Sequence, residues 1–582
     1  MAGIVVDCHS HIFNAEDIPI DGFLKRRMPV PSLLTGVFSG PLDRLASWRA
    51  PGEEEAARLL VLIRNALDGL EAAPEATRPE IVSDAELDTR LVQYLSVART
   101  VPDEGRPVVP EAAGAPEDMI EKLIAGAAPE QLAELDEWLG EEPAEEGLEG
   151  LVDLRRKAAA LREGARRLRD ALTLITQPRH VVAARLAETY DEARLFVPAL
   201  VDFDRTARDE PSTPVAQQIA IHSLVAKLSV VGGIPGARDV RIHPFAAFCP
   251  YREVETSELA GWDVGSGEPC PYVPYGDPVA KDPLDRFMPG MRFDPGRARP
   301  LRKPTGPWAS ARLDLRGVTR SLDLVRHAIE LGGFLGVKLY PPSGFLPIGN
   351  VFRFGERVGA PLDAALRALY RYCEDMEVPI LTHASHSNGF QDGYDDLASP
   401  AGWAQVLREY AGLRLCFGHF GHLYGVAAGE PVPRADSWPM RYLALMDEHE
   451  HVYADVGCSR YAFDAAYRRR FDAFLGAILG SSAGAGAGVD EVEAKRRRRL
   501  MFGSDYWMNT LDGKPAEALN EFSRGIERQF GAETVEQFRG GNALRWLGLT
   551  DEKDQIDPES RSHRRLVDFY GEQPLPDWLR AR

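Results

Sequence analysis

The sequence predicts an α/β protein built as a (β/α)8 barrel, the TIM-barrel class. Eight short apolar runs recur along the chain, and most are rich in Val, Leu, Ile and Phe without strict alternation, which is typical of parallel strands buried on both faces. Helix-compatible stretches lie between most of these runs. The alternative is a doubly wound open sheet, but no G-x-G-x-x-G motif follows any predicted strand.

Each predicted strand ends where a loop of the barrel mouth would begin. The strands are expected at residues 3–7, 195–203, 240–248, 334–340, 378–382, 413–418, 452–456 and 500–503. Helices are expected at 322–331, 362–376, 403–410 and 440–448, before the fourth to seventh strands. In such a barrel the carboxyl ends of all strands open on one face, and the loops there build the active site.

Two long segments interrupt the alternation of strands and helices. The first carries apolar residues at three-and-four spacing and is expected to be a large helical insertion after the first strand, shaping access to the pocket. The second is rich in Pro and Gly and has weak periodicity. The predicted organisation is a discontinuous barrel domain of residues 1–33 and 191–549, a helical insertion 34–190, a loop insertion 254–312 and a C-terminal tail 550–582.

Composition excludes several classes of function. The 582 residues carry a formal net charge of −20, which opposes non-specific nucleic-acid binding. No window approaches about eighteen uninterrupted apolar residues, so no membrane partner is expected. The six cysteines form no C-x-x-C pair, and no secretory signal pattern is visible, so a reducing, cytoplasmic location is expected.

Two histidines stand at the end of the first predicted strand. One residue separates His9 from His11, and side chains at this spacing point to the same side of an extended strand. Two imidazole nitrogens are half of a four-ligand zinc shell. Alone, an H-x-H pair is weak support for a metal site, because most such pairs bind nothing.

Three further residues occupy the matching place after later strands. His383 follows the fifth strand, His419 the sixth and Asp505 the eighth. Since the strand ends share one face, these side chains are expected to converge with the H-x-H pair. Three imidazoles and one carboxylate suit a divalent ion, with one Zn²⁺ as the first expectation and Mn²⁺, Fe²⁺ or Co²⁺ as alternatives. Such an ion would activate water, and a further histidine could act as acid or base.

The combined motifs resemble those of the amidohydrolase superfamily. Within it the chain is most similar to the amidohydrolase-related (amidohydrolase 2) branch, which includes metal-dependent hydrolases and decarboxylases resembling aminocarboxymuconate semialdehyde decarboxylase. The resemblance covers residues 1 to about 549. The motifs that carry it are Asp7-Cys8-His9-Ser10-His11, Thr382-His383, Gly418-His419-Phe420-Gly421, Phe502-Gly503-Ser504-Asp505 and Gly540-Gly541-Asn542-Ala543-Leu544.

The resemblance implies a role for each strand-end residue. His9, His11, His383 and Asp505 would be metal ligands. Asp505 would also accept a proton from the activated water, and His419 would orient that water or polarise the substrate carbonyl.

Lys338, in the fourth predicted strand, has three interpretations. It could attract a substrate carboxylate as a point charge, and this is the interpretation we favour. It could instead extend from the barrel edge into solvent. In some superfamily members a carboxylated lysine at this strand bridges two metals, which would make the site binuclear.

The sequence thus favours a metal-dependent hydrolase that attacks an amide, ester or lactone carbonyl of a small molecule. A metal-dependent decarboxylase of an unsaturated or aromatic carboxylate is the alternative, and a non-catalytic binding module is the third. A homo-oligomer would be compatible with each. Among other strand-end acids, Asp455 is expected only to cap the loop that follows it.

Overall fold

The structure is a computed structural model of the 582-residue chain. It describes residues 3–17, 52–70, 177–204, 211–262, 301–387, 389, 391–424, 434–457, 460–462, 464–480, 490–506 and 515–580, together with 166, 170 and 174. Most of the predicted helical insertion and of the predicted 254–312 loop lies outside the described residues.

Parallel strands occupy all eight predicted positions. They pair in the orders β1-β2-β3 and β4-β5-β6-β7-β8-β9. Their bounds are β1 Val5–Ser10, β2 Ala193–Pro198, β3 Arg241–Ile242, β4 Phe245–Ala247, β5 Gly336–Leu339, β6 Ile380–His383, β7 Leu415–Gly418, β8 Val452–Asp455 and β9 Leu500–Met501.

Strands β3 and β4 are two halves of the single third strand that the sequence predicts. Pro244 stands between them, and proline has no N–H with which to continue a ladder. Across this break, Leu200 N donates to Phe245 O at 3.0 Å, and His243 N donates to Phe196 O at 3.0 Å. Within the described residues, the two sheets are therefore one interrupted sheet of eight strands.

The first and last strands meet through individual backbone hydrogen bonds rather than a ladder. Cys8 N donates to Phe502 O at 3.2 Å, and Asp505 N donates to His9 O at 2.7 Å. His11 N donates to Tyr506 O at 3.1 Å. These bonds complete the ring, so the predicted (β/α)8 barrel is confirmed.

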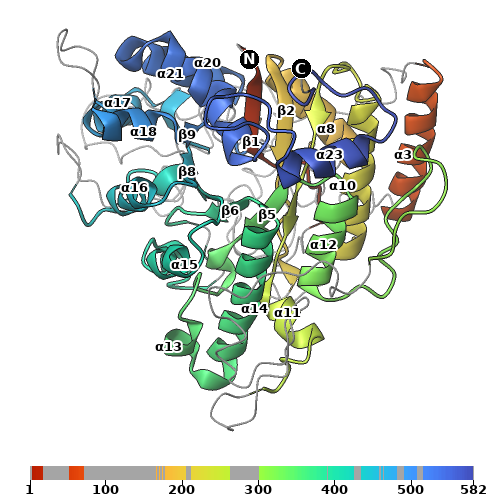
Figure 1. Ribbon diagram of the computed structural model, residues 1–582, viewed down its shortest axis with the longest axis horizontal. Coiled ribbons are helices and arrows are strands. Elements are labelled where there is room, and N and C mark those ends of the chain that lie inside the picture. The colour runs from red at the N-terminus through yellow and green to blue at the C-terminus, as the bar shows by residue number, and fades with distance from the viewer. Residues whose placement is uncertain are drawn as a thin grey trace, which may run out of the picture.

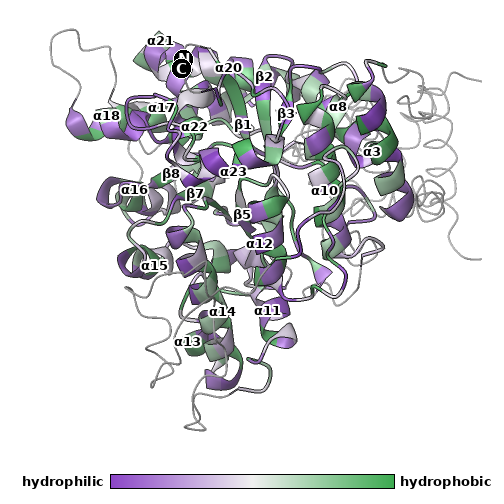
Figure 2. Cartoon of the chain, turned by 45° about the vertical axis from the view of Figure 1, so that its right-hand side comes forward, coloured by the Kyte–Doolittle hydropathy of each residue, from purple (hydrophilic) through white to green (hydrophobic). Residues whose placement is uncertain are grey.

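Helices surround the strands (Figure 1), and in Figure 2 many of them carry both hydrophobic and hydrophilic residues. The predicted helix at 362–376 begins earlier, at Glu356, so that Pro361 lies inside α14. The helices are α3 Gly52–Leu67, α8 Arg179–Thr189, α10 Val215–Val230, α11 Pro250–Thr256, α12 Ser321–Leu331, α13 Asn350–Phe354, α14 Glu356–Asp375, α15 Trp403–Glu409, α16 Trp438–Glu448, α17 Ala465–Leu479, α18 Glu491–Arg497, α20 Pro515–Phe530, α21 Ala532–Glu536, α22 Asn542–Trp546 and α23 Arg561–Tyr570.

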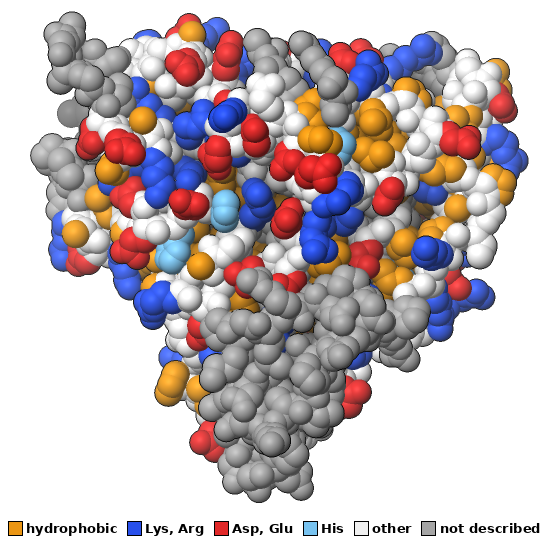
Figure 3. All heavy atoms as spheres, viewed as in Figure 1, with side chains coloured by type: hydrophobic (Ala, Val, Ile, Leu, Met, Phe, Trp, Pro, Cys, Tyr) orange, Lys and Arg blue, Asp and Glu red, His pale blue; other side chains and the backbone are white. Residues whose placement is uncertain are grey.

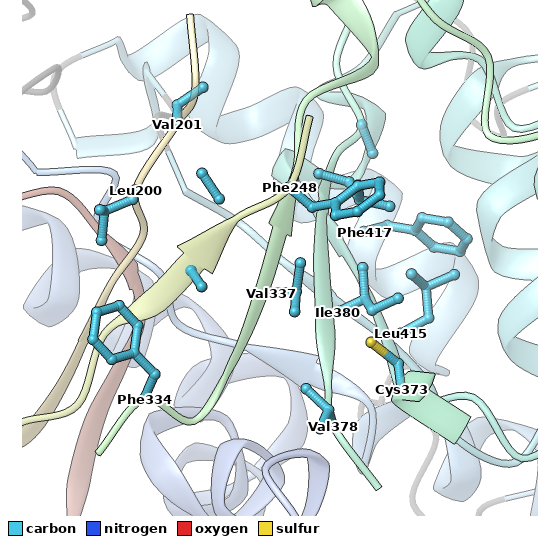
Figure 4. Close-up of a cluster of buried hydrophobic side chains, with 14 of the residues drawn as sticks. Leu200, Val201, Phe248, Phe334, Val337, Cys373, Val378, Ile380, Leu415 and Phe417 are labelled. Carbon is cyan, nitrogen blue, oxygen red and sulfur yellow. The ribbon is translucent and has the colours of Figure 1, made fainter. Parts of the chain in front are cut away.

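The main core consists of apolar side chains on the strands and on the helices that cover them. Figure 4 shows Val337, Ile380 and Leu415, which come from the successive strands β5, β6 and β7 and are fully buried. Cys373 of α14 belongs to the same cluster. Burying each such aliphatic side chain stabilises the fold by about 1.5–3 kcal/mol, which fixes the strands that position the site.

Residues after 549, predicted as a tail, pack against the barrel. Tyr570 of α23 is fully buried, and its hydroxyl lies 3.2 Å from His243 Nε2. Trp308 Nε1 donates to Phe569 O at 2.7 Å. Helix α23 therefore belongs to the packed body of the molecule.

The described surface mixes acidic and basic side chains, as Figure 3 shows. Among the described residues, no helix combines the length and the apolar character that a membrane crossing requires.

Candidate metal centre

Strand ends bring all of the predicted site residues into one buried region. His9 lies on β1, Lys338 on β5 and His383 at the end of β6. His419 follows β7 directly, and Asp505 lies four residues beyond β9. Each of these residues is at most 6% exposed.

His9, His11 and Asp505 form the tightest group. His11 Nε2 lies 3.0 Å from Asp505 Oδ1, and His9 Nε2 lies 3.7 Å from the same oxygen. One ligand atom from each residue falls within 4.8 Å of the others, a spacing suited to one shared metal ion. The strand ends thus bring three of the four predicted ligands together.

His383 stands beside this group and pairs with His419. His383 Nδ1 lies 3.1 Å from His419 Nε2, and the rings of His419 and His9 are 4.9 Å apart. On its other side, His383 Nε2 lies 3.1 Å from Ser385 Oγ. Because a hydroxyl can donate or accept, His383 can turn either a hydrogen or a lone pair toward His419.

Backbone carbonyls fix the orientation and tautomer of two histidines. His11 Nδ1 lies 2.7 Å from Ala199 O, and His419 Nδ1 lies 2.9 Å from Gly457 O. A carbonyl oxygen only accepts, so both Nδ1 atoms carry hydrogen, and Nε2 is the nitrogen of each ring that is left to bind a metal. This arrangement is typical of metal-binding histidines.

The His11–Asp505 contact is well suited to a cation. Burial lowers the pKa of His11 and favours its neutral form. Burial opposes ionisation of Asp505, but its contact with His11 and the nearby histidines together hold its pKa well below its usual range. The 3.0 Å contact between His11 Nε2 and Asp505 Oδ1 requires a positive charge between them, supplied either by a proton on Nε2 or by a metal ion that both atoms bind. The donor set fits a divalent metal.

Burial favours the neutral form of His383 and His419 as well. Burial lowers the pKa of His419 to about 3 and that of His383 well below its usual value. Neutral imidazole is the form that binds a metal or accepts a proton.

Lys338 lies inside the site, and its side chain does not reach solvent. The residue is 2% exposed, and Nζ lies 2.8 Å from His9 Nε2. Burial lowers the pKa of its ammonium group to about 8, although Asp505 and Asp455 oppose the shift. The interpretation of Lys338 as a solvent-reaching residue at the barrel edge is therefore wrong.

The backbone around the site is unusual. His419, Phe420 and Asp505 adopt φ values of 70°, 46° and 49°, which non-glycine residues adopt at an energetic cost. Close packing also demands glycine at 503, where a Cβ would lie 2.7 Å from the Cβ of His9. Backbone strain like that at His419, Phe420 and Asp505 clusters at functional sites.

Sequence reasoning underestimated Asp455, the last residue of β8. It does accept from the backbone of the following loop, at Gly457 N (2.8 Å), as predicted. It is also fully buried, and Oδ2 lies 3.1 Å from His9 Nδ1. Its place at the end of a strand that opens on the ligand face was the available signal.

Part of the chain is similar to a known protein family. Residues 298–549 match the family model described as amidohydrolase. That segment includes Lys338, His383, His419 and Asp505 but not the H-x-H pair. No curated protein matches the chain.

Among solved structures, partial similarity is found to an amidohydrolase from Burkholderia multivorans with bound HEPES. It is 16% identical, covers 40% of this chain and 71% of its own, and has a TM-score of 0.28. A 2,6-dihydroxybenzoate decarboxylase complexed with 2,6-dihydroxybenzoate is 13% identical over 63% and 87%, with a TM-score of 0.28. A uronate isomerase from Bacillus halodurans is 13% identical over 94% of both chains, with a TM-score of 0.32.

Proposed function

We propose that this chain is a metal-dependent enzyme of the amidohydrolase superfamily that hydrolyses an amide, ester or lactone bond of a small molecule. One observation carries the proposal. The Nε2 atoms of His9 and His11, with His11 fixed at Nδ1, lie 3.7 and 3.0 Å from the same oxygen of the buried Asp505, whose pKa is held well below its usual range. A core that serves packing alone has no need to gather two imidazoles and a carboxylate in this way.

His9, His11, His383 and Asp505 would hold the ion, with zinc as the first candidate. A bound divalent ion would polarise the substrate carbonyl and acidify a water molecule toward a pKa of about 7. Asp505 accepts the proton that the attacking water loses. His419, neutral and with its Nε2 lone pair turned into the site, orients the water or relays the proton to the leaving group.

Lys338 binds the negatively charged part of the substrate. Its ammonium group lies among the ligand atoms and is positioned to attract a carboxylate or a developing oxyanion. In the binuclear alternative Lys338 would be carboxylated and would help to hold two ions, with His419, beside His383, as a further ligand.

Decarboxylation of an aromatic acid is the second candidate. The aromatic rings beside His383 favour it: the Tyr340 ring is 4.8 Å from that of His383, and the Phe203 ring is 5.6 Å from that of Tyr340. This wall would receive an aromatic substrate whose carboxylate meets Lys338. The same ligands would serve either reaction.

A substrate panel separates these candidates. Metal-depleted protein, reconstituted with Zn²⁺, Mn²⁺, Fe²⁺ or Co²⁺, is incubated with lactones, amides, esters and aromatic acids, and acid release and CO₂ release are measured separately. Metal-dependent acid release without CO₂ is expected. Metal-dependent CO₂ release would replace hydrolysis by decarboxylation, and turnover unaffected by metal removal would contradict both.

A further inference from the structure

Asp455 holds two parts of the site at once. Its Oδ2 lies 3.1 Å from His9 Nδ1 and 3.6 Å from Cys416 Sγ. Its Oδ1 accepts from His419 N at 3.1 Å and from Gly457 N at 2.8 Å. The residue is fully buried, so neither oxygen is in contact with bulk solvent.

The contacts of His9 determine which ring nitrogen carries hydrogen. Lys338 Nζ lies 2.8 Å from Nε2, and an ammonium group has donors but no acceptor, so Nε2 must accept. The hydrogen of the neutral ring is then on Nδ1, where it donates to Asp455 Oδ2. Two independent contacts therefore agree on one tautomer.

The group His9, His419 and Asp455 also has metal-like spacing. Hydrogen bonding explains this group without an ion. Each oxygen of Asp455 already faces two donors, and the His9 atom nearest to it is the nitrogen that carries hydrogen.

We propose that Asp455 is a positioning residue that locks His9 in the Nδ1–H tautomer, with Nε2 directed at the metal, and joins this ligand to the loop that carries His419. The inference rests on the proposed function, because it assigns His9 Nε2 to a metal. Through its two oxygens, the carboxylate ties the end of β1 to the residues that follow β7 and β8. Carboxylates that orient metal-binding histidines in this way typically strengthen metal binding 10- to 100-fold.

The substitution Asp455→Asn keeps the shape of the side chain but changes its hydrogen-bonding groups. An amide has one acceptor oxygen and one donor nitrogen, whereas all four partners of Asp455 donate. If the NH₂ group faces His9, the ring must change tautomer and direct Nε2–H at the metal. If the NH₂ group instead faces the backbone, it meets the N–H groups of His419 and Gly457, which are also donors. The loop that carries His419 then loses its hydrogen bond to residue 455.

The test compares Asp455→Asn with Asp363→Asn in the full-length, metal-depleted protein. Asp363 is a matched control, because it is a buried carboxylate of α14 that accepts from Asn350 N at 2.9 Å and Val351 N at 3.1 Å. Zn²⁺ affinity is measured by competition with a chromophoric chelator, ligand geometry by the visible spectrum of the Co²⁺ form, and stability by thermal unfolding.

Asp455→Asn should weaken Zn²⁺ binding about 10- to 100-fold and change the Co²⁺ spectrum. Asp363→Asn should lower the melting temperature while leaving affinity and spectrum like those of the wild type. If Asp455→Asn keeps wild-type affinity and spectrum, the inference is overturned and the proposed function survives. If the wild type itself binds no metal, both are overturned.

A second measurement needs no substitution at Asp455. In ¹⁵N-histidine-labelled wild-type protein without metal, the His9 signals, assigned by their loss in His9→Gln, should report a protonated Nδ1 and an unprotonated Nε2. The opposite tautomer would overturn the inference even if Asp455→Asn does not fold.

Discussion

Two buried histidines on neighbouring parts of the barrel show what distinguishes a ligand from a core residue. His243 lies between β3 and β4, with Nδ1 2.9 Å from Gly333 O and Nε2 3.2 Å from the Tyr570 hydroxyl, so both nitrogens have ordinary partners. His11 also binds a carbonyl through Nδ1, but its Nε2 faces the Asp505 carboxylate. Both histidines are buried, but only the contact between His11 Nε2 and the Asp505 carboxylate requires a positive charge between the two groups.

The largest effect is expected from Asp505→Asn. An amide is a weaker ligand and cannot accept the proton from water, so kcat should fall about 10²- to 10⁴-fold. His243→Gln should leave kcat close to the wild-type value. Steady-state kinetics on the substrate that the panel identifies measure kcat for both variants. An equal loss of kcat in the two variants would contradict the distinction between the environments of His11 and His243.

Lys338→Met should weaken binding of an anionic substrate. A charge-assisted hydrogen bond contributes about 1.5–3 kcal/mol, which corresponds to a rise in KM of about 10- to 100-fold. A matched neutral substrate should lose much less. A KM that rises equally for both substrates would indicate that Lys338 supports the structure rather than binding charge.

Gly503→Ala should damage the site through steric overlap. The added methyl group would lie 2.7 Å from the Cβ of His9, and overpacking of this kind costs about 1–3 kcal/mol. Gly525→Ala, on α20, would bring a methyl group within 1.9 Å of Tyr461 Oη. Denaturant unfolding should show destabilisation in both variants, whereas chelator competition should show weaker metal binding only in Gly503→Ala. Unchanged metal binding in Gly503→Ala would contradict the account.

A smaller effect is expected from pH. Burial lowers the pKa of His243 from 6.5 to about 4. As pH falls below 6.5, the unfolded chain binds a proton that the folded chain does not, so the free energy of unfolding decreases until about pH 4. Between pH 7 and pH 5 this residue should account for a loss of about 2 kcal/mol. Urea unfolding of His243→Gln should show a correspondingly shallower pH dependence, and an unchanged slope would show that His243 is not the source.

The sequence was sufficient to predict the eight strands and the residues at their ends, because buried parallel strands require continuous apolar runs and the barrel directs their ends to one face. The break at Pro244 was missed, since the apolar run continues through it. Asp455 was underestimated because its importance depends on His9, which lies 446 residues away in the sequence. Neither partner reveals this contact by local spacing. The place of Lys338 inside the site likewise required the register of β5 against its neighbours.

Metal content tests the central claim most directly. Purified wild-type protein, His11→Ala and His243→Gln are loaded with Zn²⁺, freed of excess ion and analysed by elemental mass spectrometry. About one tightly bound ion per chain is expected in the wild type and in His243→Gln, and essentially none in His11→Ala. A wild-type protein without bound metal, or a His11→Ala variant that retains it, would contradict the account.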